Sequence, residues 1–223
     1  AASDVYKRQN LNCDMCYVHL SKQEMQSQGR LRSLDEWISL AKQMKDAGTL
    51  FLLLTGGEPL LFHQFKELYC ALKDMGMILT LNTNGTLINE EWAEFFAKNK
   101  PRRINITLYG SKNETYENLC HMKDGFDKTI RGIELLKKYK IDVKINGSLV
   151  KKNFHDRMEI IDIGEKYDIP VRIDTYMYPS VRERTTPFNF QERLNPEDAA
   201  KARVEILHLS LIHISEPTRH AQI

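Results

Sequence analysis

The sequence predicts an α/β fold with a parallel sheet, and two observations lead to this prediction. Strand-like and helix-like segments alternate regularly through the central part of the chain, as they do in repeated βαβ units. The most apolar run, residues 50–54, is typical of a strand that is buried on both faces. The 223 residues suffice for one domain with a sizeable core.

The individual elements follow from periodicity and capping residues. Ser33 and Glu36 form a capping box that opens one amphipathic helix, and Asn89 caps another. We expect helices at residues 33–48, 64–75, 90–98, 125–139 and 155–167. We expect strands at residues 50–54, 77–82, 103–109, 141–150 and 171–176. A sixth strand should precede the cysteines described below.

Composition limits the possible partners. The chain has 32 basic and 30 acidic residues, and its net charge of +2 gives no electrostatic reason to expect nucleic acid or a membrane surface as a partner. No apolar run approaches the roughly 20 residues of a spanning helix. Four cysteines with one close pair suit metal ligation in a reducing compartment better than a disulfide framework, which predicts a cytoplasmic location.

The close pair is Cys13 and Cys16, in a loop before the first expected helix. Thiolates are the ligands of iron–sulfur clusters, and their close spacing lets one loop wrap a cluster. Taken alone, the pair fits half a zinc site or a redox dithiol equally well. A second motif, the glycine-rich turn Gly56-Gly57-Glu58-Pro59, follows the apolar strand at the end where α/β folds bind ligands.

In this order and at this distance, the two motifs resemble the core of the radical S-adenosylmethionine (SAM) enzymes. That family has the cluster motif Cys-x-x-x-Cys-x-aromatic/apolar-Cys and the methionine-binding turn Gly-Gly-Glu-Pro. The resemblance implies a partial (β/α)6 TIM-like barrel, with Cys13 and Cys16 as ligands of a 4Fe–4S cluster and S-adenosyl-L-methionine as the second cofactor. It also implies reductive cleavage of SAM to a 5′-deoxyadenosyl radical that abstracts hydrogen from a substrate.

The same resemblance assigns candidate cofactor-binding residues to the ends of the strands. Gly56 and Gly57 let backbone carbonyls approach the SAM ammonium group, Glu58 adds negative charge, and Pro59 fixes the exit from the turn. Further candidate polar contacts follow the later strands; they are Asn84, Thr107 and Asn146. For each, an ordinary turn or a satisfied polar group is an equally good interpretation.

One ligand of the family motif is missing, because position 9 holds Gln9 where the first cysteine should be. Residues 1–9 and 209–223 resemble translated adapters from sequencing-library preparation, and we expect both segments to be non-native. The first strand is then largely missing, residues 10–178 form the barrel, and residues 179–208 lead towards a missing domain. The chain as written is expected to be inactive.

Asn-Cys-x-x-Cys-Tyr, Gly-Gly-Glu-Pro-Leu and Thr-Asn-Gly-Thr look most like the SPASM or twitch-type maturases of peptides and proteins. Expected partners are therefore a peptide or small-molecule substrate and an electron donor such as flavodoxin or ferredoxin. Two alternatives remain: a cyclase of the molybdenum-cofactor type, and a barrel without a cluster that serves as a binding scaffold.

Overall fold

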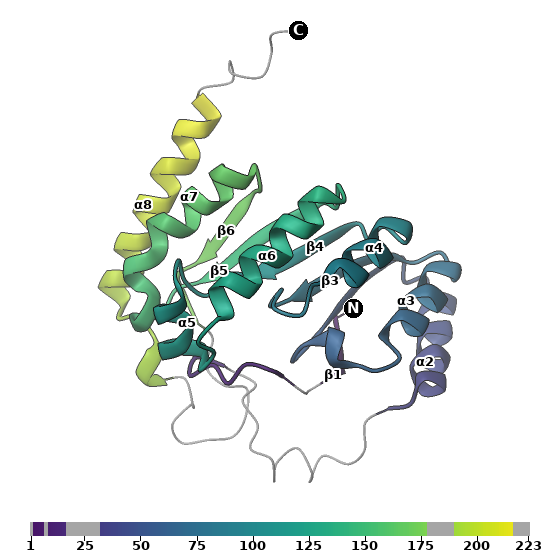
Figure 1. Cartoon of the computed structure of the whole chain (residues 1–223). Coiled ribbons are helices and arrows are strands. Elements are labelled where there is room, and N and C mark those ends of the chain that lie inside the picture. Colours follow the sequence, from purple (N-terminus) through teal and green to yellow (C-terminus); the bar gives the residue numbers. More distant parts are fainter. Residues whose placement is uncertain (1, 7–8, 17–31, 178–189, 216–223) are drawn as a thin grey trace, which may run out of the picture.

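A six-stranded parallel sheet forms the centre of the protein, as shown by a computed structural model that describes residues 2–6, 9–16, 32–177 and 190–215 (Figure 1). The strands lie side by side in the order of the sequence. They are β1 (Ala2–Tyr6), β2 (Phe51–Gly56), β3 (Ile78–Thr83), β4 (Arg103–Thr107), β5 (Val143–Ser148) and β6 (Val171–Asp174). The predicted α/β fold with a parallel sheet is confirmed.

Helices connect successive strands and pack along one face of the sheet (Figure 1). They are α2 (Leu34–Asp46), α3 (Phe65–Asp74), α4 (Glu90–Lys98), α5 (Asn113–Cys120), α6 (Gly125–Lys138), α7 (Arg157–Tyr167) and α8 (Pro196–Ser215). Three short 3-10 helices complete the described elements: η1 (Pro59–Leu61), η2 (Lys151–Asp156) and η3 (Phe190–Glu192). None of the described helices is long and apolar enough to cross a membrane.

Alternation along the strands separates an apolar face from a polar one. In β3, β4 and β5 every second side chain is buried, including Leu81, Ile106 and Ile145, and these side chains belong to the hydrophobic core. The intervening side chains are half-buried, and all but one are polar; they are Ile78, Thr80, Asn82, Arg103, Asn105, Thr107, Lys144, Asn146 and Ser148. The sheet therefore presents a row of polar groups on the face opposite the apolar one.

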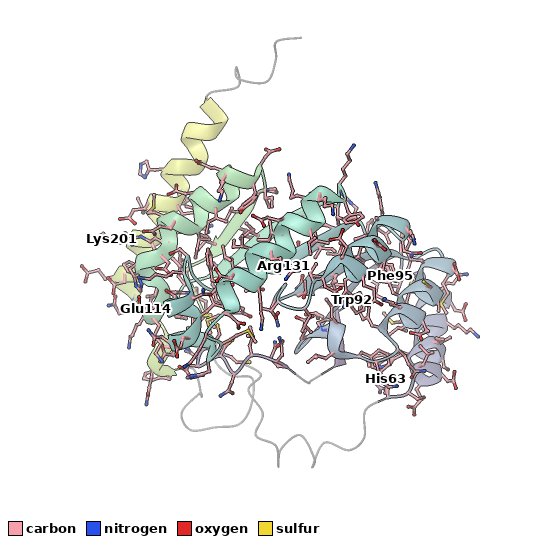
Figure 2. The ribbon with its side chains drawn as sticks, in the orientation of Figure 1. His63, Trp92, Phe95, Glu114, Arg131 and Lys201 are labelled. Atoms are coloured by element: carbon pink, nitrogen blue, oxygen red, sulfur yellow. The ribbon has the colours of Figure 1, made fainter. Side chains whose placement is uncertain are left out.

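Aromatic rings join α3 to α4 on the apolar side of the sheet. Figure 2 labels Trp92 and Phe95 of α4, which pack edge-to-face at 6.0 Å between ring centroids. The cluster also includes Phe65, Tyr69 and Phe96. The Lys66 ammonium lies 4.9 Å from the centre of the Trp92 ring, a cation–π contact. These contacts fix the helices that follow β2 and β3, and with them the turns that precede those helices.

A strand lies along the outer edge of β2, because Ala2–Tyr6 pairs in parallel with β2, from Ala2 opposite Leu53 to Tyr6 opposite Gly56. That this segment is non-native and that the native first strand is largely missing stay predictions. This segment contains Val5 and Tyr6, which favour extended backbone, and it supplies hydrogen-bond partners to the free edge of β2.

One expectation about the strands is wrong. β2 is not buried on both faces, because Phe51 is 63% exposed while Leu52 and Leu54 are buried. The apolar run marked the strand correctly but overstated its burial.

The part of the chain after the barrel has more structure than expected. α8 runs through residues that the sequence suggested as a linker and an adapter-like end, and Ala202 of α8 is fully buried. Arg157 of α7 donates to the Glu205 carboxylate at 2.7 Å, which ties α8 to the barrel. Residues 178–189, which comprise the last residue of the predicted barrel and the beginning of the predicted linker, lie outside the described residues. The proposed division into domains remains a prediction.

Candidate functional site

The two candidate ligand cysteines lie in a loop after β1 whose apolar side chains are embedded in the core. Cys13 is buried and Cys16 is half-buried, and the Cys16 amide donates to the Cys13 carbonyl at 3.2 Å. Leu11 and Met15, which flank Cys13 at a spacing of two residues, are buried in the hydrophobic core. Alternate side chains of the cysteine loop, residues 9–16, therefore anchor the segment around Cys13 in the core of the barrel.

Backbone hydrogen bonds fasten this cysteine loop to the end of α5. The amides on either side of Cys13, those of Asn12 and Asp14, donate to the carbonyls of Cys120 and Leu119 at 3.1 and 3.0 Å. The last carbonyls of a helix have no partner within the helix, so the loop satisfies groups that would otherwise need capping. The sequence did not predict α5, and this anchorage was therefore not foreseen.

Cys120 lies directly behind Cys13. Burial raises the pKa of the Cys120 thiol strongly, and the hydrogen bond and charge interaction with the neighbouring Cys13 raise it further. Burial also raises the pKa of Tyr109, and charge interactions with Cys13, Cys120 and Tyr116 add to this shift. Full burial is typical of a cysteine with a structural role, and Cys120 is fully buried.

The glycine turn begins where β2 ends. Gly56 closes β2 with a φ of +155°, a conformation that side chains with a Cβ rarely adopt. Gly57 is half-buried, and the buried Pro59 begins η1 at its first position, where the missing amide is not needed. The motif thus forms a strand-to-helix turn at the carboxyl end of β2, as predicted.

Glu58 points from this turn to the neighbouring one. Its fully buried carboxylate accepts hydrogen bonds from the Thr83 hydroxyl at 2.8 and 2.9 Å, the Asn84 amide at 2.9 Å and the Leu60 amide at 3.1 Å. Burial raises the pKa of Glu58 to about 7, although these hydrogen bonds favour the charged form. Glu58 therefore holds the turns after β2 and β3 together. Whether it also contacts SAM stays a prediction.

Asn84 connects the turn after β3 to the cysteine loop. Its side-chain amide donates to Gln9 Oε1 at 3.0 Å and to Asn10 Oδ1 at 2.8 Å. Its side-chain oxygen, Oδ1, accepts hydrogen bonds from the Thr86 amide at 3.0 Å and from the Thr86 hydroxyl at 2.6 Å. Gln9, the residue at the position of the missing cysteine, is thus one hydrogen bond from a predicted cofactor-binding residue.

The remaining candidates, Thr107 and Asn146, lie opposite each other on β4 and β5. Both are half-buried on the polar face of the sheet. On the same face, Asn105 donates to Asn82 Oδ1 at 2.8 Å across β3 and β4. The structure therefore brings Glu58 and Asn84 into direct contact and places Thr107 beside Asn146. Among the described residues, no hydrogen bond joins one pair to the other, and the cofactor-binding role of all four remains a prediction.

Sequence reasoning missed an ionic cluster beside the cysteine loop, formed by Asp14, His121, Lys152 and Glu192. Three of these residues come from different connections that only the folded barrel brings together. The one available signal was the acidic residue Asp14 between the two cysteines, since a charge there needs a partner.

The residues fit a 4Fe–4S cluster at two of its three expected ligand positions. In residues 2–6, 9–16, 32–177 and 190–215, no three cysteine, histidine, aspartate or glutamate side chains are grouped to bind a metal ion. Cys13 and Cys16 supply two thiolates, whereas Gln9 offers an amide oxygen that accepts from Asn84. Iron–sulfur clusters use thiolates rather than amides, so restoring a thiol at position 9 is the change that the site requires.

Comparison with known proteins identifies the family. The model of the radical SAM superfamily matches residues 7–164. The chain is 29% identical over 164 residues to Fe-coproporphyrin III synthase of Methanosarcina barkeri, which covers 74% of the chain and 40% of that protein. It is 33% identical over 151 residues to the cysteine-type anaerobic sulfatase-maturating enzyme of Clostridium perfringens, covering 61% and 40%.

Solved structures of Streptococcus suis SuiB share the fold. The structure bound to S-adenosylmethionine superimposes with a TM-score of 0.76 at 18% identity, covering 95% of this chain and 47% of SuiB. The structure bound to the precursor peptide SuiA gives a TM-score of 0.75 at 16% identity, with 95% and 46% covered. This likeness confirms the partial barrel.

The chain spans less than half the length of these relatives. Within that span, paired cysteines precede a glycine turn on a parallel sheet, in the order that the family motif requires. The family match extends over most of the chain. The chain belongs to the radical SAM superfamily.

Proposed function

We propose that this chain is the catalytic core of a radical SAM enzyme that modifies a peptide or protein. The observation that supports this function best is the junction of three segments at one end of the sheet: the cysteine loop, the Gly56-Gly57 turn and the Asn84 turn. When bound, the 4Fe–4S cluster supplies the electron that cleaves SAM to the 5′-deoxyadenosyl radical.

The protein's own residues would bind and orient the cofactors. Cys13 and Cys16 are the proposed thiolate ligands, and the backbone of Gly56 and Gly57 offers close approach to the SAM ammonium group. Glu58 and Asn84 keep the surrounding turns in register with the cysteine loop.

Thr107 and Asn146 are proposed as polar contacts for SAM on the face of the sheet that carries polar side chains. In a preorganised site of this kind, the cofactors supply the radical chemistry, and the protein directs it by holding cofactor and substrate in the required positions.

Two relatives support a peptide as the substrate. One is named a sulfatase-maturating enzyme, and one solved structure contains a bound precursor peptide. A small-molecule substrate is the second candidate, because the Methanosarcina barkeri relative is named Fe-coproporphyrin III synthase. A binding measurement separates these candidates. If the substrate is a porphyrin, iron coproporphyrin III should bind and its visible absorption should shift. If the substrate is a peptide, a cysteine-containing peptide should bind and no such shift should occur with the porphyrin.

We further propose a cytoplasmic location, on the basis of reduced cysteines, and an electron donor such as flavodoxin or ferredoxin. The donor is proposed because the family's cleavage reaction consumes one electron.

The experiment that tests this function starts from Gln9→Cys. The variant is reconstituted anaerobically with iron and sulfide, and 5′-deoxyadenosine is measured after addition of SAM and a reductant. We expect product from Gln9→Cys and at least a hundredfold less from the chain with Gln9, because one cluster ligand is absent.

Cys13→Ala in the Gln9→Cys background should abolish product. Cys70→Ala is the matched control, because Cys70 lies half-buried on α3, outside the site, and should leave product formation unchanged. A stable Gln9→Cys protein that binds iron but forms no 5′-deoxyadenosine would contradict the proposal and favour a binding scaffold.

A further inference from the structure

Asp14 lies between the two proposed cluster ligands and is held by a histidine and a lysine from elsewhere in the barrel. One carboxylate oxygen, Oδ1, lies 2.8 Å from His121 Nε2, and the other, Oδ2, lies 2.5 Å from Lys152 Nζ. His121 is the C-cap of α5, and Lys152 belongs to η2 after β5. Each oxygen of Asp14 therefore has its own partner, and the two partners come from different connections.

Lys152 joins more segments than any other member of this cluster. Besides Asp14, its ammonium lies 3.4 Å from Glu192 Oε1 and 3.4 Å from the carbonyl oxygen of Asn118. An ammonium group has three donors, and these three oxygens match that number. One side chain thus links the cysteine loop, α5 and the segment after the barrel.

The ion pairs of this cluster are partly shielded from solvent. The side chains of Asp14 and Lys152 are 25% and 37% exposed, and that of Glu192 is 15% exposed. Lys152 therefore lies between two acidic side chains, one of which stands next to the proposed ligand Cys13.

We propose that Lys152, acting through Asp14, is a positioning residue for the iron–sulfur cluster, an inference that rests on the proposed function. Lys152 fixes the cysteine loop against α5 and offsets the negative charge of Asp14 beside the cluster ligands. Its contact with Glu192 extends this link to the segment after the barrel. The geometry of the cysteine loop therefore depends on the position of that segment.

The first test needs no cluster. Amide hydrogen exchange is measured on the full chain for Asn12 and Asp14, the two amides that bond to α5. Lys152→Met should speed their exchange about fivefold, the equivalent of roughly 1 kcal/mol, while the amide of Ile104 in β4 serves as the internal reference. Lys152→Arg should restore protection. Lys151→Met is the matched control, because Lys151 is an exposed neighbour in η2 outside this cluster.

The second test uses the reconstituted Gln9→Cys protein and measures the reduction potential of the cluster. Lys152→Met removes a positive charge and should lower the potential, whereas Asp14→Asn removes a negative charge and should raise it. If Lys152 and Asp14 had a purely structural role, both variants would disturb the cluster, but their reduction potentials would not shift in opposite directions. Lys152→Arg should keep the potential of the parent.

The outcomes separate the two proposals. If Gln9→Cys assembles no cluster, the proposed function fails, while hydrogen exchange still decides the role of Lys152 in the loop. Unchanged exchange in Lys152→Met would overturn the inference, and so would potentials that move in the same direction in Lys152→Met and Asp14→Asn. Faster exchange together with opposite shifts would support it.

Discussion

Glu58 shows how one buried carboxylate can hold the neighbouring turns of a site together. It is fully buried, yet its three kinds of hydrogen-bond donor come from its own turn and from the turn after β3. Burial opposes the charged form, and the hydrogen bonds support it. The balance leaves the pKa of Glu58 at about 7, so the group changes charge in the physiological range.

This pKa predicts a pH dependence of stability. Because the folded protein holds the proton up to about pH 7 and the unfolded chain loses it near 4.5, the folded state binds more protons between these values. Stability should therefore fall as the pH rises from 4.5 to 7, by up to about 3 kcal/mol for this group, and level off above that.

Denaturant unfolding across this range should show that decline in the parent and a flatter profile in Glu58→Gln. Glu159→Gln, which changes an exposed glutamate of α7, is the control and should keep the parental slope. Equal slopes in the parent and Glu58→Gln would show that Glu58 titrates normally.

At the scale of residues, sequence reasoning located the site better than it described its bonds. The glycine turn and the paired cysteines were recognisable because each motif is local. The partners of Glu58 were not, since Thr83 lies 25 residues further along the chain and reaches Glu58 only through the pairing of β2 with β3. The same reason hid Lys152, which is 138 residues from Asp14.

Among the elements, η2 depends on one buried amide. Asn153 is fully buried; its Oδ1 accepts from the Val150 amide at 2.7 Å, and its Nδ2 donates to the carbonyls of Tyr109 and Ser148 at 2.9 and 3.1 Å. It thereby connects the segments that follow β4 and β5.

Asn153→Ala should lower the free energy of unfolding by roughly 3 kcal/mol, because three buried backbone groups lose their partner. Asn89→Ala, which removes the exposed N-cap of α4, should cost about 1 kcal/mol. Thermal or denaturant unfolding of both variants tests whether Asn153→Ala loses more free energy of unfolding than Asn89→Ala. A smaller loss for Asn153→Ala than for Asn89→Ala would mean that the connection after β5 contributes little to global stability.

Periodic elements were predicted well, and irregular ones were not. The five predicted helices and the five predicted strands all occur, within a few residues of their expected ends, because amphipathic spacing and caps are local signals. α5 was missed because its eight residues carry no side-chain cap hydrogen bond at Lys112. α8 was missed because proline and charged residues before it suggested a connection.

For the molecule as a whole, β1 covers an edge of the sheet. It pairs with Leu53, Leu54, Thr55 and Gly56 of β2. Deleting residues 1–6 would leave the hydrogen-bonding groups of β2 open, and exposed edges promote association between chains. We expect the shortened chain to associate in a concentration-dependent manner, as measured by light scattering, while the full chain remains less associated at the same concentration.

The control for this deletion replaces residues 1–6 with an unrelated sequence of equal length that favours strands. Recovery of the parental behaviour would attribute the effect to edge pairing rather than to particular side chains. An unchanged scattering profile after deletion would show that β1 does not protect the edge.

The architecture as a whole was predictable because each strand lies beside the next one in the sequence. Alternating segments with short connections then leave few arrangements to choose from. The identity of the first strand could not be predicted, since edge pairing is decided by backbone groups that many extended segments can satisfy.

The same order of strands has a consequence for synthesis on the ribosome. Each strand can join the sheet as it emerges, because its neighbour has already been made. The cysteine loop differs, since the carbonyls that hold it belong to residues 119 and 120 and the ammonium group that neutralises it belongs to residue 152. The loop is therefore made before the residues that hold it and is completed only after the fifth strand. Metal loading on a nascent chain should begin late, when most of the sheet has already left the exit tunnel.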